Sequence, residues 1–364
     1  MNILFISDLN GDLTKGPNNS VPKQVEAQSK IDDVLWLNLQ PSNLEMWHGF
    51  DFYMGTNEKN ISLEKLDSPF SSPDCIVFEG LYEYPFNRIA IEAMRNGIPY
   101  VIVPRSAMTD CAQKQKRLKK FLGNTVFFGE FVRKATAIQF LTDVEMEQSV
   151  RWRNKYSFVI PNGIDLPPCG CSKITNTRKG IKAAYIGRLD IYQKGIDLLL
   201  DACAIKQEEL RSNGFSLELY GPDFNGSLAV IEDEIRKANI EDMVFLRGPV
   251  FGEEKASVLS ESDMFVMASR FEGFSMGLVE ALAFGLPSVV SVGTNIAEEI
   301  EAAGAGWNAG STVESLANTL VIASSAQLQG RKVENARKFA SRYRWDAIAD
   351  RTHDVLTEIT GIKE

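Results

Sequence analysis

The amino-acid sequence contains little histidine and little cysteine, with two His and five Cys among 364 residues. A zinc centre needs about four clustered ligands. Neither His48 nor His353 lies near the close cysteine pair Cys169 and Cys171, so the sequence argues against a metal site there. An odd and sparse set of cysteines indicates reduced thiols and predicts a cytoplasmic protein.

Long apolar runs and an excess of positive charge are also missing. No segment approaches the roughly 20 apolar residues that a membrane-spanning helix requires. The N-terminal segment MNILFISDLNG lacks a basic start and a cleavage site, so it predicts a first strand and not a signal peptide. The 39 Lys and Arg residues against 48 Asp and Glu give a net charge of -9, which argues against nucleic-acid binding.

The sequence has the composition of a soluble globular protein, with 44% hydrophobic and 24% charged residues. Short apolar runs alternate with amphipathic segments of helix length, which predicts an α/β fold of parallel sheets covered by helices. Because the runs are continuously apolar, we expect strands buried on both faces. The predicted strands are Asn2–Ile6, Val34–Leu39, Cys75–Phe78, Tyr100–Val103, Ala137–Leu141, Ala183–Ile186, Ser216–Tyr220, Met243–Leu246, Met264–Met267 and Ser288–Ser291.

The length suits two Rossmann-like domains of roughly 150 to 200 residues each. A boundary is predicted within Pro161–Lys179, where prolines, Gly170 and a polar stretch without periodicity separate two similar halves. We therefore expect domains over 1–165 and 166–344, with a C-terminal helix of about 345–364 that could pack back on the first. Nucleotides bind beyond the carboxyl ends of such strands, so the expected site is a cleft between two facing sheets.

An acidic loop containing glycines follows the predicted strand Met264–Met267. A helix is expected from about Gly277 to the stop signals Gly285 and Pro287, so the loop Gly273–Gly277 would offer free N–H groups at a helix N-terminus, which suits an anion. Glu272 in the loop and Glu280 in the helix are placed to bracket an extended ligand. The alternative is that Glu280 only favours the helix dipole and that Glu272 is a solvated charge.

Two cations follow the predicted strand Ala183–Ile186. Arg188 comes directly after Gly187, and Lys194 precedes a helix expected near Gly195. Arginine binds phosphate oxygens in a fork and lysine supplies a point charge, so the pair suits a diphosphate. The alternative is ordinary surface charge.

The combination of Gly187-Arg188-Leu189, Lys194-Gly195 and Glu272-(x7)-Glu280 resembles glycosyltransferase family 4, retaining enzymes of the GT-B fold. Supporting segments occur in the family's order and extend the resemblance over nearly all of the second half: Val159–Asp165, Leu219-Tyr-Gly221 and Val244–Val250. The first half matches in its pattern and in the loop Gly11–Gly16.

The resemblance implies a role for each matching residue. Arg188 and Lys194 would neutralise the donor's diphosphate, while Glu272 would hold hydroxyls of the transferred sugar and Glu280 the ribose. The remaining contacts implied are the backbone of Phe274, Ser275 and Met276 to sugar and phosphate, Leu278 and the Val250 region beside the base, and the backbone of Gly16 close to the diphosphate. Gly187 and Gly277 are further implied substrate-binding residues. The donor would be a nucleotide sugar, with UDP preferred because it is common in the family, and no cofactor is implied.

Such an enzyme retains the anomeric configuration by attack from the face on which the diphosphate departs, so it needs no protein base. No D-x-D motif is present, and we expect no metal. One departure stands out, since many family members carry Pro-His-Gly, whose His contacts the donor sugar, where this chain has Pro104-Arg105-Ser106. Either the donor sugar lacks the common hydroxymethyl group, or Arg105 or Ser106 makes a different contact.

The segment Lys114–Leu122 carries five cations in a net-acidic chain, with Phe127, Phe128 and Phe131 close behind. This suits anionic lipid headgroups or a polyprenyl-diphosphate acceptor, at the inner face of the membrane. The alternatives are a solvated helix face and a phosphorylated soluble acceptor. The expected acceptor is a glycan or lipid-linked saccharide of bacterial-type polysaccharide or glycoconjugate biosynthesis.

Two other functions share the fold. A GT-B-fold epimerase or phosphorylase would not need the two glutamates at this spacing. A catalytically silent partner that binds a nucleotide sugar would keep the donor-site residues. A dehydrogenase is disfavoured, because no G-x-G-x-x-G follows the first strand.

Overall fold

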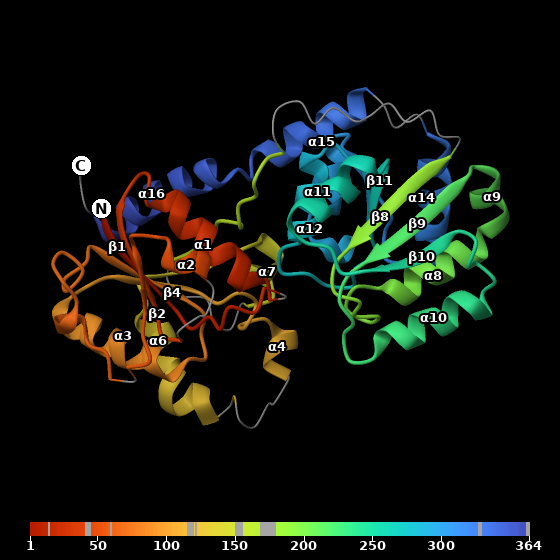
Figure 1. The fold of residues 1–364 in the computed structure, drawn as a ribbon. Coiled ribbons are helices and arrows are strands. Elements are labelled where there is room, and N and C mark those ends of the chain that lie inside the picture. The colour runs from red at the N-terminus through yellow and green to blue at the C-terminus, as the bar shows by residue number, and fades with distance from the viewer. Residues whose placement is uncertain are drawn as a thin grey trace. The chain divides into compact units, whose positions relative to one another are not determined.

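The computed structural model describes residues 1–13, 15–40, 45–58, 60–114, 120, 122–149, 156–167, 180–326 and 330–361. The chain forms two compact units: unit 1 comprises Met1–Gly163 and Trp345–Glu364, and unit 2 comprises Ile164–Arg344. Each unit is a parallel, Rossmann-like sheet flanked by helices (Figure 1). The predicted fold class is therefore confirmed. Most of the segment Lys114–Leu122 lies outside the described residues, as do Cys169 and Cys171.

The sheet of unit 1 has seven described strands in the order β3-β2-β1-β4-β5-β6-β7. These are β1 (Asn2–Ser7), β2 (Asp33–Asn38), β3 (Tyr53–Gly55), β4 (Cys75–Glu79), β5 (Tyr100–Val103), β6 (Ala137–Phe140) and β7 (Ser157–Val159). Ser7 of β1 pairs in register with Asn38 of β2 on one side and Glu79 of β4 on the other. The strand order reverses between β1 and β4.

The described helices of unit 1 are α1 (Gly16–Gln28), α2 (Glu45–His48), η1 (Leu63–Lys65), α3 (Tyr84–Asn96), α4 (Asp110–Lys114), η2 (Asn124–Phe128), α6 (Gly129–Lys134), α7 (Asp143–Glu147) and α16 (Trp345–Thr360). Although α1 and α16 come from opposite ends of the chain, they lie side by side (Figure 1), with Trp345 packed on Ala27. His353 of α16 also lies 2.9 Å from Asp32 through Nδ1 and Oδ1.

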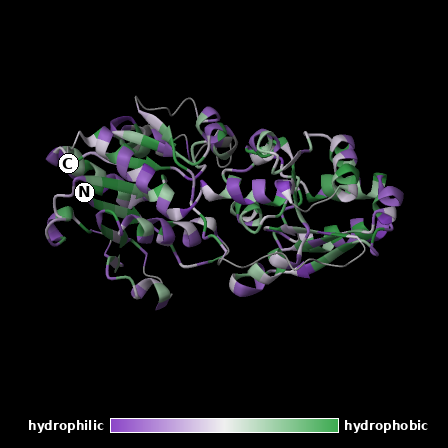
Figure 2. Ribbon diagram, turned by 90° about the horizontal axis from the view of Figure 1, so that it is seen from above, coloured by the Kyte–Doolittle hydropathy of each residue, from purple (hydrophilic) through white to green (hydrophobic). Residues whose placement is uncertain are grey.

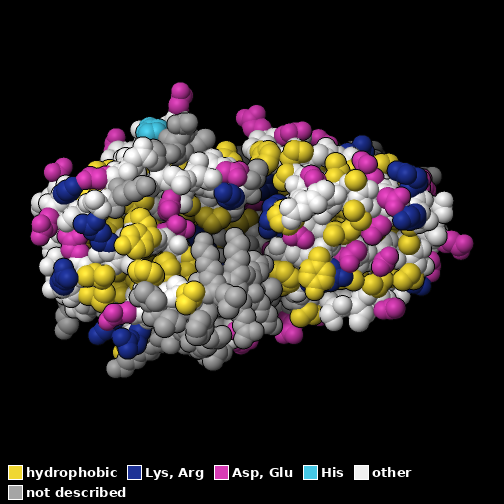
Figure 3. Space-filling model, turned by 90° about the horizontal axis from the view of Figure 1, so that it is seen from below, with side chains coloured by type: hydrophobic (Ala, Val, Ile, Leu, Met, Phe, Trp, Pro, Cys, Tyr) yellow, Lys and Arg dark blue, Asp and Glu magenta, His cyan; other side chains and the backbone are white. Residues whose placement is uncertain are grey.

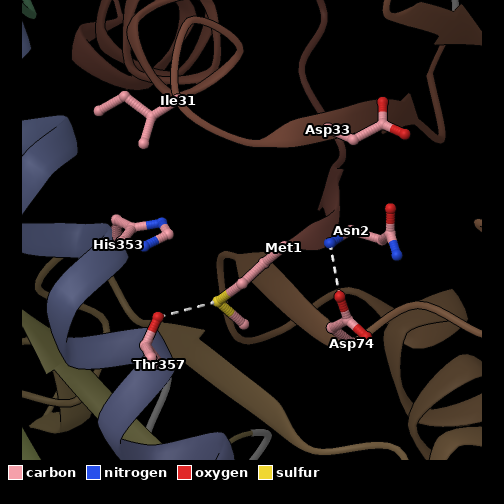
Figure 4. A pocket seen from close by; sticks show the side chains of 7 residues that line it. All are labelled: Met1, Asn2, Ile31, Asp33, Asp74, His353 and Thr357. Atoms are coloured by element: carbon pink, nitrogen blue, oxygen red, sulfur yellow. Dashed lines mark hydrogen bonds between the residues drawn. The ribbon is translucent and has the colours of Figure 1, made fainter. Parts of the chain in front are cut away.

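A hollow of about 420 Å³ opens at the amino ends of β1, β2 and β4. Figure 4 shows its lining, which is Met1, Asn2, Ile31, Asp33, Asp74, His353 and Thr357. The backbone N–H of Asn2 donates to Oδ2 of Asp74 at 2.7 Å across it. Ligands of parallel sheets bind at the carboxyl ends of the strands, so this hollow lies at the wrong edge for the expected site.

The sheet of unit 2 has six described strands in the order β10-β9-β8-β11-β12-β13. These are β8 (Ile181–Ile186), β9 (Phe215–Tyr220), β10 (Val244–Gly248), β11 (Met264–Met267), β12 (Ser288–Val290) and β13 (Gly306–Asn308). The described helices are α8 (Ile196–Ile205), α9 (Gln207–Ser212), α10 (Ser227–Lys237), α11 (Gly252–Glu261), α12 (Met276–Ala283), η4 (Val292–Thr294), α13 (Ala297–Ala302), α14 (Val313–Ser325) and α15 (Arg331–Ser341). The two ends of the unit lie next to each other, since the backbone N–H of Ile164 donates to the carbonyl oxygen of Tyr343 at 2.7 Å.

The apolar residues form a separate core within each unit, and the strands at the centre of each unit are hydrophobic in Figure 2. All four residues of β11 are buried, as expected of a strand covered on both faces. The ten predicted strands all form, with ends that differ by at most two residues. The sequence did not predict the three-residue strands β3, β7 and β13, whereas the equally short β12 was predicted from its apolar run.

Candidate active site

The loops that follow β8 and β11 bring the two sequence motifs of unit 2 together. These strands are neighbours, with Met264 opposite Ala183, and the strand order reverses between them. Gly187 and Arg188 follow β8, and Glu272 follows β11. The motifs therefore lie at the carboxyl edge of the sheet and at its switch point, where open parallel sheets bind ligands.

Lys194 and Glu272 form an ion pair at this edge. Nζ of Lys194 lies 2.5 Å from Oε1 of Glu272, and the side chains are only 12% and 6% exposed. The hydroxyl of Ser269 donates to the same carboxylate oxygen at 2.6 Å. The side-chain amide of Asn295 donates to the backbone oxygen of Glu272 at 2.5 Å. Glu272 is therefore a buried, fixed acid and not the solvated loop charge of the alternative interpretation.

Further contacts hold the two loops in register. The backbone N–H of Arg270 donates to the carbonyl oxygen of Gln193 at 2.9 Å. The Arg270 guanidinium binds the carboxylate of Asp197 with distances of 2.7 and 2.8 Å. Gly195 adopts φ +62°, and a Cβ atom there would lie 2.0 Å from the carbonyl oxygen of Ala268. Only glycine permits this approach, which explains the glycine that follows Lys194.

Arg188 lies beside the ion pair without a carboxylate of its own among the described residues. Its guanidinium lies 4.7 Å from the centre of the Phe224 ring, and its Nη2 donates to Oε1 of Gln193 at 3.4 Å. The hydroxyl of Tyr185 donates to the backbone oxygen of Arg188 at 2.8 Å. Burial raises the pKa of Tyr185 well above its ordinary value, and the charge of Glu272 acts in the same direction. Tyr185 thus remains a hydrogen-bond donor that holds the Arg188 backbone.

No side chain among the described residues caps the N-terminus of α12, so its first backbone N–H groups have no side-chain acceptor. The hydroxyl of its N-cap residue Ser275 lies 2.9 Å from Sδ of Met267, and no acidic residue occupies the first turn. A Cβ atom at Gly277 would lie 2.8 Å from the carbonyl oxygen of Ile186, so glycine brings this helix close to the end of β8. The arrangement suits an anion beside Arg188 and Lys194.

Other predicted contacts of unit 2 lie differently. Glu280 forms an ion pair with Lys255 of α11, and both side chains are about three-quarters buried. Leu278 is fully buried in the core and Val250 is 6% exposed, so protein covers most of both side chains in this conformation. Contacts from these positions would come from the backbone or from Phe251, which is 53% exposed. Phe274 is partly buried against the core.

In unit 1, Gly16 begins α1, and the space around its Cα is open, with no atom within 4 Å of an added Cβ. Arg105 and Ser106 adopt φ +48° and +68° after β5. The N–H of Ser106 donates to the carboxylate of Glu145. The side chain of Arg105 is only 8% exposed and forms an ion pair with Glu79. A direct sugar contact through this guanidinium would require it to leave its protein partners.

Sequence reasoning missed the residues that hold the motifs in place. Ser269, Asn295, Gln193 and Tyr185 are uncharged, and each forms a hydrogen bond with Glu272 or Arg188. Ser269, Gln193 and Tyr185 lie three to five positions from their partners, whereas Asn295 contacts Glu272 across 23 positions. In the described part of the chain, no three His, Cys, Asp or Glu side chains gather as metal ligands, and no helix has the length and apolar character to cross a membrane.

Two parallel-sheet Rossmann-like units with the paired motifs at one switch point define a GT-B fold. The whole chain is similar to HepE of Anabaena, solved in complex with UDP, with a TM-score of 0.72 and 18% identity over 98% of this chain and 100% of that one. It is also similar to sucrose-phosphate synthase from Thermosynechococcus elongatus, with a TM-score of 0.71 and 17% identity over 99% and 100% of the chains. At these identities the likeness concerns the fold.

The sequence profile of the family described as Glycosyl transferases group 1 matches residues 172–340. Mannosylfructose-phosphate synthase of Agrobacterium fabrum is 31% identical over 152 residues, which are 38% of this chain and 33% of that protein. The amylovoran biosynthesis glycosyltransferase AmsK of Erwinia amylovora is 32% identical over 121 residues, which are 32% and 29%. The alignments thus span about a third of these relatives. Residues 172–340, a little under half of the chain, are therefore similar to the glycosyl transferases group 1 family.

Proposed function

We propose that the chain is a retaining glycosyltransferase that transfers a sugar from a nucleotide-diphosphate sugar, with a UDP-sugar as the first choice of donor. The Lys194–Glu272 ion pair, beside Arg188 and the N-terminus of α12, is the observation that carries the proposal. Two cations and a helix N-terminus suit a diphosphate, and a fixed carboxylate suits sugar hydroxyls. The UDP in the solved HepE structure supports the choice of nucleotide.

The proposed reaction breaks the anomeric C–O bond, and the leaving diphosphate keeps the bonding electron pair. Arg188 and Lys194 stabilise the developing negative charge, a kind of contact worth roughly 3 to 4 kcal/mol when one donor is removed. The acceptor hydroxyl attacks from the face that the diphosphate leaves, and a phosphate oxygen takes its proton. Configuration is retained without a protein nucleophile or base. Glu272 orients the sugar, and Glu280 binds the ribose.

Unit 2 takes the donor and unit 1 the acceptor in this proposal. The acceptor is a glycan or lipid-linked saccharide, and the pathway is polysaccharide or glycoconjugate biosynthesis. The similarity to a glycosyltransferase named for amylovoran biosynthesis supports this class of acceptor.

The test is to incubate the pure protein with a panel of nucleotide sugars and to follow slow release of UDP or GDP without acceptor. Lys194→Ala should weaken UDP binding and slow release, and Glu272→Ala should nearly abolish release with a modest change in UDP affinity. Lys206→Ala is the control, since it removes an exposed ion pair with Glu209 on the same unit. Wild-type rates in both site variants would remove the assignment. A protein that binds a nucleotide sugar but releases no UDP or GDP would favour the catalytically silent partner. Conversion of the donor into its epimer would favour the epimerase.

We also propose that unit 1 contacts an anionic membrane surface through the segment Lys114–Leu122. Around its described end, Leu122, Phe127 and Tyr84 are 63%, 49% and 68% exposed, and Nζ of Lys120 lies 5.2 Å from the Tyr82 ring centre. The face of unit 1 in Figure 3 carries hydrophobic side chains with Lys and Arg, and also Asp and Glu, among them. Such a mixture suits lipid headgroups.

Sedimentation with anionic liposomes tests the membrane contact. Reversal of Lys116, Arg117, Lys119 and Lys120 to Glu should abolish sedimentation. Arg133→Glu, at an exposed position of α6, is the matched control and should have a smaller effect. Undiminished sedimentation of the fourfold variant would contradict the proposal.

A further inference from the structure

A buried polar cluster lies in unit 1 at the carboxyl ends of β4 and β5. Glu79 is the last residue of β4 and stands beside the end of β1 in register. Arg105 follows β5, and Gln24 comes from α1. Because the strand order reverses between β1 and β4, this cluster lies at the switch point of unit 1, where a parallel sheet leaves a crevice for a ligand.

The guanidinium of Arg105 organises the cluster. Nε and Nη2 lie 2.8 and 2.7 Å from Oε2 of Glu79, and Nη2 also donates to Oε1 of Gln24 at 3.1 Å. Nη1 donates to Oγ of Ser20 at 3.0 Å and to Oδ1 of Asn162 at 3.3 Å. A guanidinium has five N–H donors, and these five contacts account for all of them. The Arg105 guanidinium therefore fixes the orientation of the Glu79 and Gln24 side chains.

Two atoms of this cluster have no hydrogen-bond partner among the described residues. They are Oε1 of Glu79 and Nε2 of Gln24, in residues that are only 4% and 5% exposed. The orientation of the Gln24 amide is fixed, because its Oε1 must face the arginine, which only donates. A buried polar atom without a partner costs about 1 to 3 kcal/mol, so a ligand group that satisfies both atoms would be stabilised at this site.

One hydroxyl group can satisfy both atoms. It donates its hydrogen to the carboxylate oxygen of Glu79 and accepts the N–H of Gln24 through its own oxygen. Both side chains contact the same nitrogen of Arg105, Nη2, at 2.7 and 3.1 Å. A phosphate has no hydrogen to offer Glu79 when fully ionised, and an ammonium group cannot accept from Gln24.

The charge around the cluster also selects against an anion. Burial raises the pKa of Glu79, and Arg105 opposes this shift. Glu83, which precedes α3, forms a side-chain hydrogen bond with Asp8, which follows β1. Arg105 also acts on the carboxyl group of Glu145, so the cations and acids at this edge of the sheet leave no excess of positive charge among the described residues. A neutral, hydroxyl-rich ligand fits this surrounding better than a phosphate does.

We infer that Glu79 and Gln24, oriented by Arg105, form a recognition site for a hydroxyl group of a sugar. The inference rests on the proposed function, because a glycosyltransferase handles two sugars, the acceptor and the sugar of the donor. The chemistry of the site is the same for both, so the experiment must distinguish them.

Gln24→Met tests the site, since it removes the amide but keeps the length of the side chain. Gln28→Met is the matched control: Gln28 lies one turn further along α1, is fully buried, and donates to Asp32 at 2.6 Å on the amino side of the sheet. For each variant we would measure KM of the acceptor, KM of the donor in acceptor-free hydrolysis, UDP affinity and Tm. Deoxy analogues of the recognised sugar complete the set.

Gln24→Met is expected to raise one of the two KM values about tenfold, the worth of roughly one hydrogen bond, with UDP affinity unchanged. A higher KM for the acceptor alone assigns the hydroxyl to the acceptor. A higher KM for the donor in acceptor-free hydrolysis assigns it to the donor sugar. The wild type should discriminate against one deoxy analogue, and the variant should not. A structural role alone would not remove this discrimination.

Unchanged KM values for both sugars, or equal changes in Gln28→Met, would overturn the inference. A wild-type protein that hydrolyses no donor would instead contradict the proposed function and leave this site without its basis.

Discussion

Nζ of Lys194 and Oε1 of Glu272 are 2.5 Å apart, although 78 positions separate the residues in the sequence. The cation proposed for the diphosphate is therefore already held by the acid proposed for the sugar. A donor must compete with Glu272 for this lysine. The pair is mostly buried, so solvent weakens it less than it weakens a surface ion pair.

Glu272→Gln should bind UDP more tightly than the wild type, by roughly fivefold or about 1 kcal/mol, because the variant frees Lys194 from a competing charge. Donor hydrolysis should nonetheless fall steeply. Isothermal titration with UDP measures the first effect and product release the second. Glu280→Gln, which loses the ion pair with Lys255, should show no such gain. Weaker UDP binding by Glu272→Gln would show that the two residues do not compete.

Ser269→Ala should lower kcat about tenfold to hundredfold while UDP affinity stays the same. Its hydroxyl donates to the Glu272 carboxylate at 2.6 Å, and a hydrogen bond to a charged group is worth about 1.5 to 3 kcal/mol. Steady-state kinetics of donor hydrolysis would measure the loss. Ser288→Ala is the control, since Ser288 is equally buried but donates to the backbone oxygen of Leu286. Equal losses in both variants would indicate a stability effect only.

Gly195→Ala should destabilise unit 2 by about 2 to 4 kcal/mol, because the added methyl group meets the carbonyl oxygen of Ala268 at 2.0 Å and forces the loops apart. Gly226 has a similar backbone angle, φ +79° against +62°, but open space around it. Gly226→Ala should therefore cost only about 1 kcal/mol, the penalty of the backbone angle. Urea unfolding compares the two, and similar losses would refute the contact.

The pH dependence of stability should carry the signature of Glu83. Burial and the neighbouring Asp8 raise the pKa of Glu83 from 4.5 to about 7. Between these values the folded protein keeps a proton that the unfolded chain has released, so the free energy of unfolding falls as pH rises through this window. Glu83→Gln should flatten this part of the profile. Urea unfolding of both proteins between about pH 5 and pH 8 would measure it, and parallel profiles would contradict the prediction.

Transfer and donor hydrolysis should survive exhaustive chelation. The proposed mechanism places Arg188 and Lys194 where a divalent cation would otherwise balance the diphosphate. Rates with EDTA and with added Mg²⁺ or Mn²⁺ would measure this, and the same protein with Lys194→Ala is a useful comparison. A loss of activity that metal restores would refute metal independence.

The sequence predicted ten of the described strands and the two motif loops, because continuous apolar runs and glycines are local signals. It did not predict how the loops are held. Asn295 contacts Glu272 across 23 positions, and Arg105 draws its partners from positions 20, 24, 79 and 162. Such contacts depend on the packing of distant elements, which no periodicity records. The burial of Leu278 was within reach of sequence reasoning, since Leu278 and Leu282 share one face of a short helix.

The adjacent ends of unit 2 have an architectural consequence. Unit 2 is inserted into the chain of unit 1 at one point, between Gly163 and Trp345. Its two ends are adjacent, because Ile164 and Tyr343 are joined by a hydrogen bond. When the two ends of an inserted domain are adjacent, the domain can be removed or replaced without changing the rest of the fold, because a short linker can join the flanking residues. Unit 2, which we propose binds the nucleotide sugar, could therefore be exchanged as one piece without changing the path of the chain in unit 1.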